Sequence, residues 1–437
     1  MEITGISIDS RSIKEGELFV ALKGPRFDGH DFVPDALKKG ACGALVERTS
    51  LEKKYAVLGG LKNILPVEDT LFALQEMAIA HRRKFTIPVV AVTGSNGKTT
   101  TKEMIAAMAK QKGPVLKNEG NLNNHIGVPL TLMNLNERHR AAVLEMGMSA
   151  AGEIDVLARI VAPTIGVITN IGPAHLEFFG SLDKIADAKG ELLDNLNSDA
   201  VAVLNADDAF CEKLRTKFNG PIVTFGMEKD ADVRAVRIVP GFDHIDFTIT
   251  ARNESVDVRL RMVGNHNIAN ALAAAAAALA MGIPLDAVKY GIEDFTPVAM
   301  RSEVRNIEGR TVLADYYNAN PASMEAAIRT MVSLAAGRNA IAVVGDMLEL
   351  GSASAEIHRN VGAFAARNGV AFVIMLGDLA KHFGEGARLA GMLPSRTIEA
   401  RTHKEAAQLA MKLSRPGDVI LIKGSRGMKM EKILEAF

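Results

Sequence analysis

The fold is decided by the stretch Ile87-Pro-Val-Val-Ala-Val-Thr93-Gly-Ser-Asn-Gly-Lys-Thr99. Its first half is an apolar run typical of a central parallel strand, and residues 99–111 have a helical pattern. Backbone N–H groups of a glycine-rich loop between a strand and a helix can hold phosphate oxygens. We therefore predict that this loop binds ATP, with Lys98 reaching the β- and γ-phosphates and the Thr99 hydroxyl ligating magnesium.

The loop carries a shortened form of the phosphate-binding pattern. The full Walker pattern has a glycine at the position where Val92 stands. An ordinary glycine-rich turn is therefore the alternative interpretation. The order of strand, loop, lysine, threonine and helix favours phosphate binding.

Composition excludes several classes of function. The chain of 437 residues suits roughly three domains of about 150 residues each. Lys+Arg and Asp+Glu both number 51, so bulk charge does not indicate nucleic-acid binding. Cys42 and Cys211 lie in unrelated segments, so neither a disulfide framework nor a zinc site is expected.

The sequence predicts a cytoplasmic protein without a membrane span, and we expect a monomer. The N-terminus opens with acidic and polar residues, which argues against a signal peptide. The most apolar stretch, Ile268 to Met281, is shorter than the roughly 20 residues that span a bilayer. We interpret it as a helix packed in a protein core.

Strands and helices alternate along the chain, which predicts an α/β protein of three domains. Residues 1–84 form a small N-terminal α/β domain. Residues 85–297 form a central domain with a P-loop-type parallel sheet, and alternating segments in residues 231–262 predict a small antiparallel insert. Residues 298–437 form a Rossmann-like C-terminal domain without a G-x-G-x-x-G fingerprint, so a dinucleotide cofactor is not expected.

Two further strands of the central domain end in polar residues. Glu145 follows the apolar run 141–144, and Asn170 and His175 follow the strand at 165–169. The carboxyl ends of parallel strands meet at the ligand-binding edge of the sheet. Glu145 is therefore a candidate magnesium ligand, with a loop salt bridge as the alternative. For His175 a structural role and a role in the site are equally open.

Four segments follow one another along the chain in a characteristic order. They are Thr93-Gly-Ser-Asn-Gly-Lys-Thr99, Asn170-Ile-Gly-Pro-Ala-His175, Gly264-Asn-His-Asn-Ile-Ala-Asn270, and Met300-Arg301 followed by Asp315-Tyr-Tyr-Asn-Ala-Asn-Pro321. Together they resemble the Mur ligase superfamily, the ATP-dependent amide-forming enzymes of bacterial cell-wall precursor synthesis. The resemblance covers nearly the whole chain.

The resemblance is greatest to the branch that joins D-alanyl-D-alanine to UDP-N-acetylmuramoyl-tripeptide. Three segments carry it: Gly120-Asn-Leu-Asn-Asn-His-Ile-Gly-Val-Pro129, Tyr317-Asn-Ala-Asn-Pro-Ala-Ser-Met324 and Val344-Gly-Asp-Met-Leu-Glu-Leu-Gly351. The sister branch that adds a diamino acid usually carries a D-N-P-R motif in its last domain, and the sequence has no such motif. The sister branch and a non-catalytic ATP-binding regulator remain the alternatives.

The resemblance implies a site for ATP and two magnesium ions, with Lys189 carbamylated as a metal ligand. The implied catalytic residues are Lys98, His175, Lys189 and Arg301. The implied metal ligands are Thr99, Glu145, His175 and Lys189. The implied ATP-binding residues are Gly94, Ser95, Asn96, Gly97, Lys98, Thr99, Thr100, Asn267, Asn270, Arg301, Asp315, Asn318 and Asn320. The implied residues for the UDP-sugar substrate and the dipeptide are Ser10, Arg11, Asn121, Asn124, Asp346, Glu349 and His358.

Overall fold

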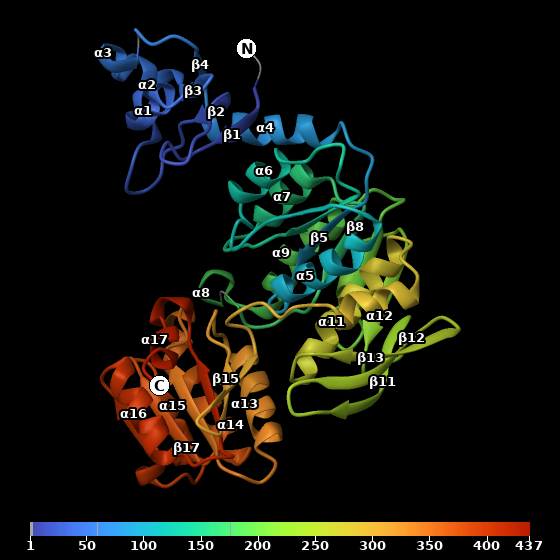
Figure 1. Ribbon diagram of the computed structural model, residues 1–437, viewed down its shortest axis with the longest axis vertical. Coiled ribbons are helices and arrows are strands. Elements are labelled where there is room, and N and C mark those ends of the chain that lie inside the picture. Colours follow the sequence, from blue (N-terminus) through green and yellow to red (C-terminus); the bar gives the residue numbers. More distant parts are fainter. Residues whose placement is uncertain (1–2, 59, 175) are drawn as a thin grey trace.

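The computed structural model describes residues 3–58, 60–174 and 176–437 (Figure 1). The chain forms three α/β units, each with its own sheet, which confirms the predicted architecture. In Figure 1 the N-terminal unit lies at the top and the C-terminal unit at the bottom, and the central unit joins them. Domain boundaries at 84/85 and 297/298 stay a prediction.

The N-terminal unit is built on a four-stranded parallel sheet in the order β1-β2-β3-β4. Its strands are β1 (Gly5–Ser7), β2 (Glu17–Val20), β3 (Gly43–Glu47) and β4 (Ile64–Val67). Its helices are η1 (Gly29–Phe32), α1 (Val33–Lys38), α2 (Arg48–Lys53) and α3 (Tyr55–Leu58). Helix α4 (Thr70–Arg82) leads to the central unit, and its N-terminus is capped by the Asp69 carboxylate, which accepts from Phe72 N at 2.9 Å.

The central unit has a nine-stranded sheet in the order β13-β12-β11-β10-β9-β8-β5-β7-β6. Its strands are β5 (Val89–Thr93), β6 (Val115–Lys117), β7 (Ala141–Glu145), β8 (Ile165–Ile168), β9 (Val201–Asn205), β10 (Ile222–Gly226), β11 (Val233–Pro240), β12 (Ile245–Ala251) and β13 (Glu254–Leu260). The predicted antiparallel strands β11 to β13 are present, but they are no separate sheet. Parallel pairing of Phe225 with Val233 joins β10 to β11, so the antiparallel strands extend the main sheet.

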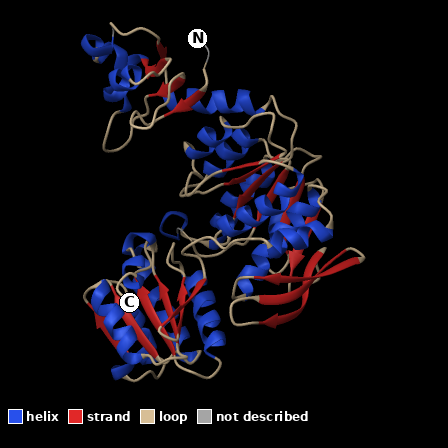
Figure 2. Cartoon of the chain, in the orientation of Figure 1, coloured by secondary structure: helices blue, strands red, loops and turns tan. Residues whose placement is uncertain are grey.

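Helices cover both faces of the central sheet, as Figure 2 shows. They are α5 (Lys98–Ala109), η2 (Lys110–Lys112), α6 (Gly127–Leu132), α7 (Glu153–Val161), α8 (Leu176–Phe179), α9 (Leu182–Asp194), α10 (Cys211–Arg215), α11 (Asn265–Ala280) and α12 (Leu285–Glu293). Val90 and Val92 of β5 pack in the core under α5 and α11, whereas Val89 and Ala91 pack in the core on the opposite face. Burial on both faces explains the uninterrupted apolar run.

The C-terminal unit has a six-stranded sheet in the order β14-β15-β19-β16-β17-β18. Its strands are β14 (Glu303–Ile307), β15 (Arg310–Ala314), β16 (Ala340–Gly345), β17 (Phe372–Leu376), β18 (Thr397–Ala400) and β19 (Val419–Lys423). Its helices are α13 (Pro321–Ala335), η3 (Gly351–Ala353), α14 (Ser354–Arg367), α15 (Lys381–Leu389), η4 (Pro394–Arg396), α16 (His403–Leu413), η5 (Arg426–Met428) and α17 (Glu431–Leu434). Apart from β14, which pairs antiparallel with β15, the sheet is parallel.

No helix in the described ranges is long and apolar enough to cross a membrane. The alanine-rich helix α11 is instead enclosed in the central core, where Ala271 and Ala273 to Ala278 are fully buried. Their small side chains let neighbouring elements approach the helix backbone closely. This packing agrees with the predicted core helix.

Candidate active site

The loop between β5 and α5 requires glycine at two positions. Gly94 has φ 146° and Gly97 has φ 82°, a region that glycine adopts readily and other residues avoid. A Cβ atom at Gly94 would lie 1.9 Å from Thr169 Oγ1, and one at Gly97 would lie 2.0 Å from Asn270 Oδ1. The backbone therefore follows its neighbours so closely that no side chain fits.

The end of β8 holds this loop in place. Ser95 N donates to the Asn170 main-chain oxygen at 2.9 Å, and Asn96 N donates to Asn170 Oδ1 at 2.9 Å. The Ser95 hydroxyl donates to Gly172 O and accepts from Gly172 N, both at 2.8 Å. The loop is therefore preorganised by hydrogen bonds of the protein itself.

The Lys98 side chain folds back over the loop. Its Nζ donates to Gly94 O at 2.8 Å and to Ser95 O at 3.3 Å. Burial lowers the pKa of Lys98, and the nearby Arg301 lowers it further, against the opposing attraction of Glu145. An anion bound beside this amine would restore the charge that burial disfavours.

Thr99 connects an acidic and a basic side chain. Its hydroxyl donates to Glu145 Oε2 at 2.7 Å and accepts from Arg301 Nη2 at 2.9 Å. Glu145 is only 4% exposed, and its other carboxylate oxygen accepts from Asn123 Nδ2 at 2.8 Å. The hydroxyl and the carboxylate are hard oxygen donors of the kind that magnesium prefers.

Lys189 of α9 adds a second buried amine to the same site. The residue is 2% exposed, and burial together with the charge of Lys98 places the pKa of Lys189 well below its usual range. Among the hydrogen bonds and ion pairs between described residues, none includes the Lys189 amine. His175 lies outside the described residues, so its role as a metal ligand stays a prediction.

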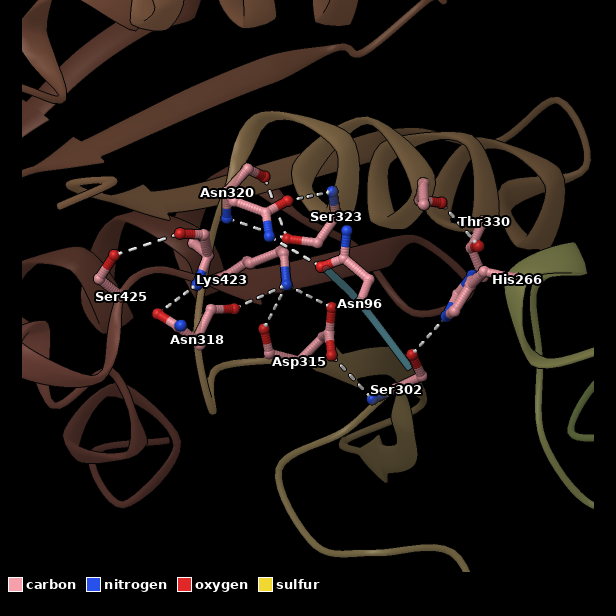
Figure 3. Close-up of polar contacts among 12 residues, drawn as sticks. Asn96, His266, Ser302, Asp315, Asn318, Asn320, Ser323, Thr330, Lys423 and Ser425 are labelled. Atoms are coloured by element: carbon pink, nitrogen blue, oxygen red, sulfur yellow. Dashed lines mark hydrogen bonds and ion pairs between the residues drawn. The ribbon is translucent and has the colours of Figure 1, made fainter. Parts of the chain in front are cut away.

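A buried cluster links the central and C-terminal units at the other end of the site (Figure 3). Lys423 Nζ donates to Asp315 Oδ2 at 2.6 Å and to Asn318 O at 3.0 Å. Asp315 Oδ1 accepts from Ser302 N at 3.1 Å, and the Ser302 hydroxyl lies 3.1 Å from His266 Nε2 of α11. Burial raises the pKa of Asp315, but the ion pair with Lys423 outweighs burial and leaves the pKa lowered.

Asparagines complete the contact between the two units. Asn320 Nδ2 donates to Asn96 Oδ1 at 2.8 Å, so the cap of α13 touches the glycine-rich loop. In α11, Asn270 Nδ2 donates to Asn267 Oδ1 at 3.1 Å, and Asn267 Nδ2 donates to Val263 O at 2.8 Å. Asn270, a predicted ATP-binding residue, lies directly behind the loop, where Gly97 approaches its Oδ1.

One cavity of about 660 Å³ brings most of the predicted site residues together. Predicted residues in its lining are Gly94, Ser95, Asn96, Gly97, Lys98, Thr99, Thr100, Asn121, Asn124, Glu145, Lys189, Asn267, Asn270, Arg301, Asp315, Asn318 and Asn320. The described residues Ser10, Arg11, Asp346, Glu349 and His358 are not in this lining. The described residues predicted to bind nucleotide and metal thus share one cavity with Asn121 and Asn124, and the other predicted substrate residues lie outside its lining.

In the N-terminal unit, Arg11 is on the surface and pairs with Asp9, with 2.7 Å between Nη2 and Oδ2. Hydrogen bonds from Arg11 lower the pKa of Asp9 to about 2. Ser10 is buried, and its main-chain oxygen accepts from Lys39 Nζ at 2.9 Å. An exposed guanidinium of this kind is available to an anionic ligand.

In the C-terminal unit, His358 is fully buried behind the loop that follows β16. Its Nε2 accepts from Met347 N at 3.0 Å and its Nδ1 lies 2.7 Å from Ser354 O, so both ring nitrogens are engaged with main chain. Burial lowers the pKa of His358. Asp346 accepts from Ala380 N at 2.7 Å, and Glu349 O accepts from Glu177 N at 3.4 Å, where α8 meets this loop.

The cavity also includes residues that were not among the predicted site residues. Asn123 contacts the Glu145 carboxylate, and Lys423 neutralises Asp315. His266 contacts Ser302 in the segment between α12 and β14, which we call the linker. Asn123 lies in a run of asparagines in which sequence alone distinguishes no member. Asn123 and His266 both lie inside quoted motifs, and their place in those motifs was the available signal.

Comparison with known proteins agrees with this geometry. The family descriptions that match are Mur ligase middle domain at residues 92–278, Mur ligase, glutamate ligase domain at 300–426, and Mur ligase family, catalytic domain at 2–82. The chain belongs to the Mur ligase family. It is similar to the UDP-N-acetylmuramoyl-tripeptide--D-alanyl-D-alanine ligase of Bacillus subtilis (strain 168), with 38% identity over 99% of this chain and 93% of the relative.

Solved structures give the same result. MurF from Acinetobacter baumannii has a TM-score of 0.90 and 34% identity, over 100% of this chain and 93% of that chain. MurF ligase from Thermotoga maritima in complex with ADP has a TM-score of 0.87 and 29% identity, over 99% of this chain and 96% of that chain. The similarity therefore extends over all three units.

We predict that Asp315→Asn lowers the free energy of unfolding of the C-terminal unit by about 3 kcal/mol at pH 7, because Lys423 is left buried without its counterion. The lowered pKa of Asp315 means that the ion pair stabilises the fold above about pH 4 and that this stabilisation is lost as pH falls through the folded-state pKa. Urea unfolding between pH 3 and 7 should therefore show the two proteins converging in acid.

The control is the double variant Asp315→Asn, Lys423→Met, which removes the unpaired charge and should recover part of the loss. A difference between wild type and Asp315→Asn that stayed constant from pH 7 to pH 3 would contradict the ion-pair explanation.

Proposed function

We propose that the protein is an ATP-dependent ligase that joins D-alanyl-D-alanine to UDP-N-acetylmuramoyl-tripeptide in the synthesis of peptidoglycan precursors. The proposal depends on one observation. The glycine-rich loop, Glu145, Lys189 and Arg301 line the same cavity. The similarity to the Bacillus subtilis ligase over 99% of the chain supports the choice of substrates.

The cavity fits ATP on two independent observations. The glycines let the loop backbone pack closely against Thr169 and Asn270, and the loop lies at the N-terminus of α5, which favours negative charge. Arg301 Nε is buried and has no hydrogen-bond partner among the described residues, so a phosphate oxygen would satisfy it. ATP would supply the phosphoryl group that activates a carboxylate.

The oxygen donors beside this loop fit magnesium. Thr99 and Glu145 would hold one ion, and His175 with a carbamylated Lys189 would hold the second. Magnesium supplies positive charge that neutralises the phosphate oxygens during transfer. Arg301, which donates to the Thr99 hydroxyl in this structure, would donate to phosphate oxygens of the bound nucleotide.

The environment of Lys189 supports its carbamylation in this proposal. Burial and the charge of Lys98 lower the pKa of Lys189, which favours the neutral amine with its lone pair. This nitrogen attacks the carbon of CO2, a C–N bond forms, and one proton leaves to water. The product is a carbamate whose two oxygens could bind metal, so that a neutral amine becomes an anionic group.

The proposed reaction has two steps. An oxygen of the tripeptide carboxylate attacks the γ-phosphorus, the bond from phosphorus to the ADP oxygen breaks, and an acyl phosphate forms. The amino group of D-alanyl-D-alanine then attacks the acyl carbon, phosphate leaves, and the nitrogen loses a proton. Lys98 and Arg301 stabilise the negative charge that moves in both steps.

The remaining assignments belong to the same proposal. Residues 1–84, with Ser10 and Arg11, would bind the UDP-sugar, and Asn121 and Asn124 would contact the substrate from the cavity. The loop with Asp346 and Glu349 would face the dipeptide, and His358 would support that loop from behind. The proposal also includes domain boundaries at 84/85 and 297/298, a monomeric state and a cytoplasmic location.

The decisive assay is phosphate release from ATP with UDP-N-acetylmuramoyl-tripeptide, comparing D-alanyl-D-alanine, lysine and diaminopimelate as acceptors. We expect phosphate release only when D-alanyl-D-alanine is the acceptor. The tripeptide substrate already contains the residue that the sister branch would add. Turnover only with a diamino acid on a dipeptide substrate would assign the chain to the sister branch. ATP binding without phosphate release under any of these conditions would indicate a regulator.

The role of Lys189 makes a separate prediction. Lys189→Ala should lose more than about 99% of the ligase activity, since the carbamate oxygens are missing metal ligands. Short carboxylic acids such as acetate should restore part of it by occupying the vacated space, and Lys217→Ala on the neighbouring surface should need no rescue. Full activity of Lys189→Ala without added acid would refute the metal role.

A further inference from the structure

Asn118 pairs its side chain with the main chain of Glu145. The parallel ladder between β6 and β7 ends where Lys117 faces Val143. Asn118 Oδ1 then accepts from Glu145 N, and Asn118 Nδ2 donates to Glu145 O, both at 2.9 Å. The amide thus continues the ladder with a side chain in place of main chain.

A buried lysine holds Asn118 in turn. Lys102 is 1% exposed, and its Nζ donates to the Asn118 main-chain oxygen at 2.5 Å. Its counterion is Glu103, with 3.0 Å between Nζ and Oε1. Lys102 lies on α5, the helix whose first turn carries Lys98 and Thr99. The helix that begins at the phosphate loop therefore also holds the end of β6.

The same asparagine organises the loop that touches the Glu145 carboxylate. Asn118 Nδ2 also donates to Leu122 O at 2.9 Å, and the next residue, Asn123, donates to Glu145 Oε1 at 2.8 Å. Gly147 N donates to Asn123 O at 2.8 Å, which fixes the loop from its other side. Asn118 is 1% exposed, so water cannot replace these bonds.

We propose that Asn118, held by Lys102, is the positioning residue that orients Glu145 for metal binding. Asn118 fixes the Glu145 main chain, Asn123 fixes one carboxylate oxygen, and the other oxygen is left to Thr99 and the ion. The inference rests on the proposed magnesium role of Glu145. Asn118 touches no reacting atom and acts only through Glu145.

The test is the magnesium dependence of ADP binding, measured by isothermal titration calorimetry on the full chain. The ADP dissociation constant is measured in EDTA and then at rising Mg2+ for wild type, Asn118→Ala, Lys102→Met and Glu145→Gln. We expect the Mg2+ concentration for half-maximal tightening to rise about 10–100-fold in Asn118→Ala. Lys102→Met should change in the same direction by less, and affinity in EDTA should stay within about twofold, because loop and adenine contacts remain.

Thr164→Val is the matched control. The Thr164 hydroxyl brackets Val89 in the same way, accepting from its N–H at 3.0 Å and donating to its carbonyl at 3.2 Å. These two hydrogen bonds lie at the opposite end of the same sheet. Their loss should lower thermal stability without changing the Mg2+ dependence of ADP binding. Thermal unfolding of all variants shows how far each lowers stability.

The outcomes separate the two levels of the proposal. In one outcome, Mg2+ no longer tightens ADP binding in Glu145→Gln but tightens it in Asn118→Ala as in wild type. The positioning role of Asn118 is then wrong, and the metal role of Glu145 is supported. If Glu145→Gln also keeps the effect, the metal role of Glu145 is wrong. A loss of ADP affinity in EDTA equal to the loss in Mg2+ would show that Asn118 is merely structural. Should Asn118→Ala fail to fold, Lys102→Met decides by the same readout.

Discussion

The hydrogen bond from the Thr99 hydroxyl to the Glu145 carboxylate joins the first turn of α5 to the end of β7, and the rest of the site is arranged around it. Both groups are placed by parallel strands that end at the same edge of the sheet. The glycine-rich loop lies between them because β8 holds its backbone through Asn170 and Gly172. Three strands, β5, β7 and β8, and helix α5 therefore determine where phosphate and metal can bind.

The second constraint is that the cavity belongs to two units of the protein. Arg301 reaches Thr99 from the linker, and its guanidinium lies 4.0 Å from the ring centre of Tyr317. Met300 and Ser302, which flank Arg301, have φ values of 66° and 50°, a conformation that costs free energy in residues other than glycine. The C-terminal unit, through Asp315 and Lys423, keeps the linker in this conformation. Movement of that unit would therefore move Arg301 with it.

Part of this arrangement could be predicted from sequence. The β5-loop-α5 unit and the position of Glu145 follow from apolar runs that end in polar residues, since strand ends of a parallel sheet meet. Edge strands β14 and β18 are hard to predict from sequence, because their residues are polar and partly exposed and no apolar run marks them. The continuity of β11 with β10 depends on pairing between strands, which a pattern within one strand does not reveal.

Individual polar side chains were the least predictable part of the site. Asn118 resembles any loop asparagine in the sequence, and only the structure shows that its amide pairs with Glu145. His358 has the residue type of a site histidine, but both its nitrogens bind main chain in the interior. Lys189 has the sequence context of a solvated helical lysine, and its burial results from packing around α9. Such roles depend on tertiary contacts that no local pattern encodes.

The central claim is that the γ-phosphate passes to a carboxylate in this cavity. The most direct test is ligase turnover with tripeptide substrate whose reacting carboxylate carries 18O, followed by mass spectrometry of the released phosphate. Formation of an acyl phosphate predicts that one 18O atom moves from the carboxylate into each phosphate released with D-alanyl-D-alanine. Phosphate that contains no 18O from the substrate would contradict the account.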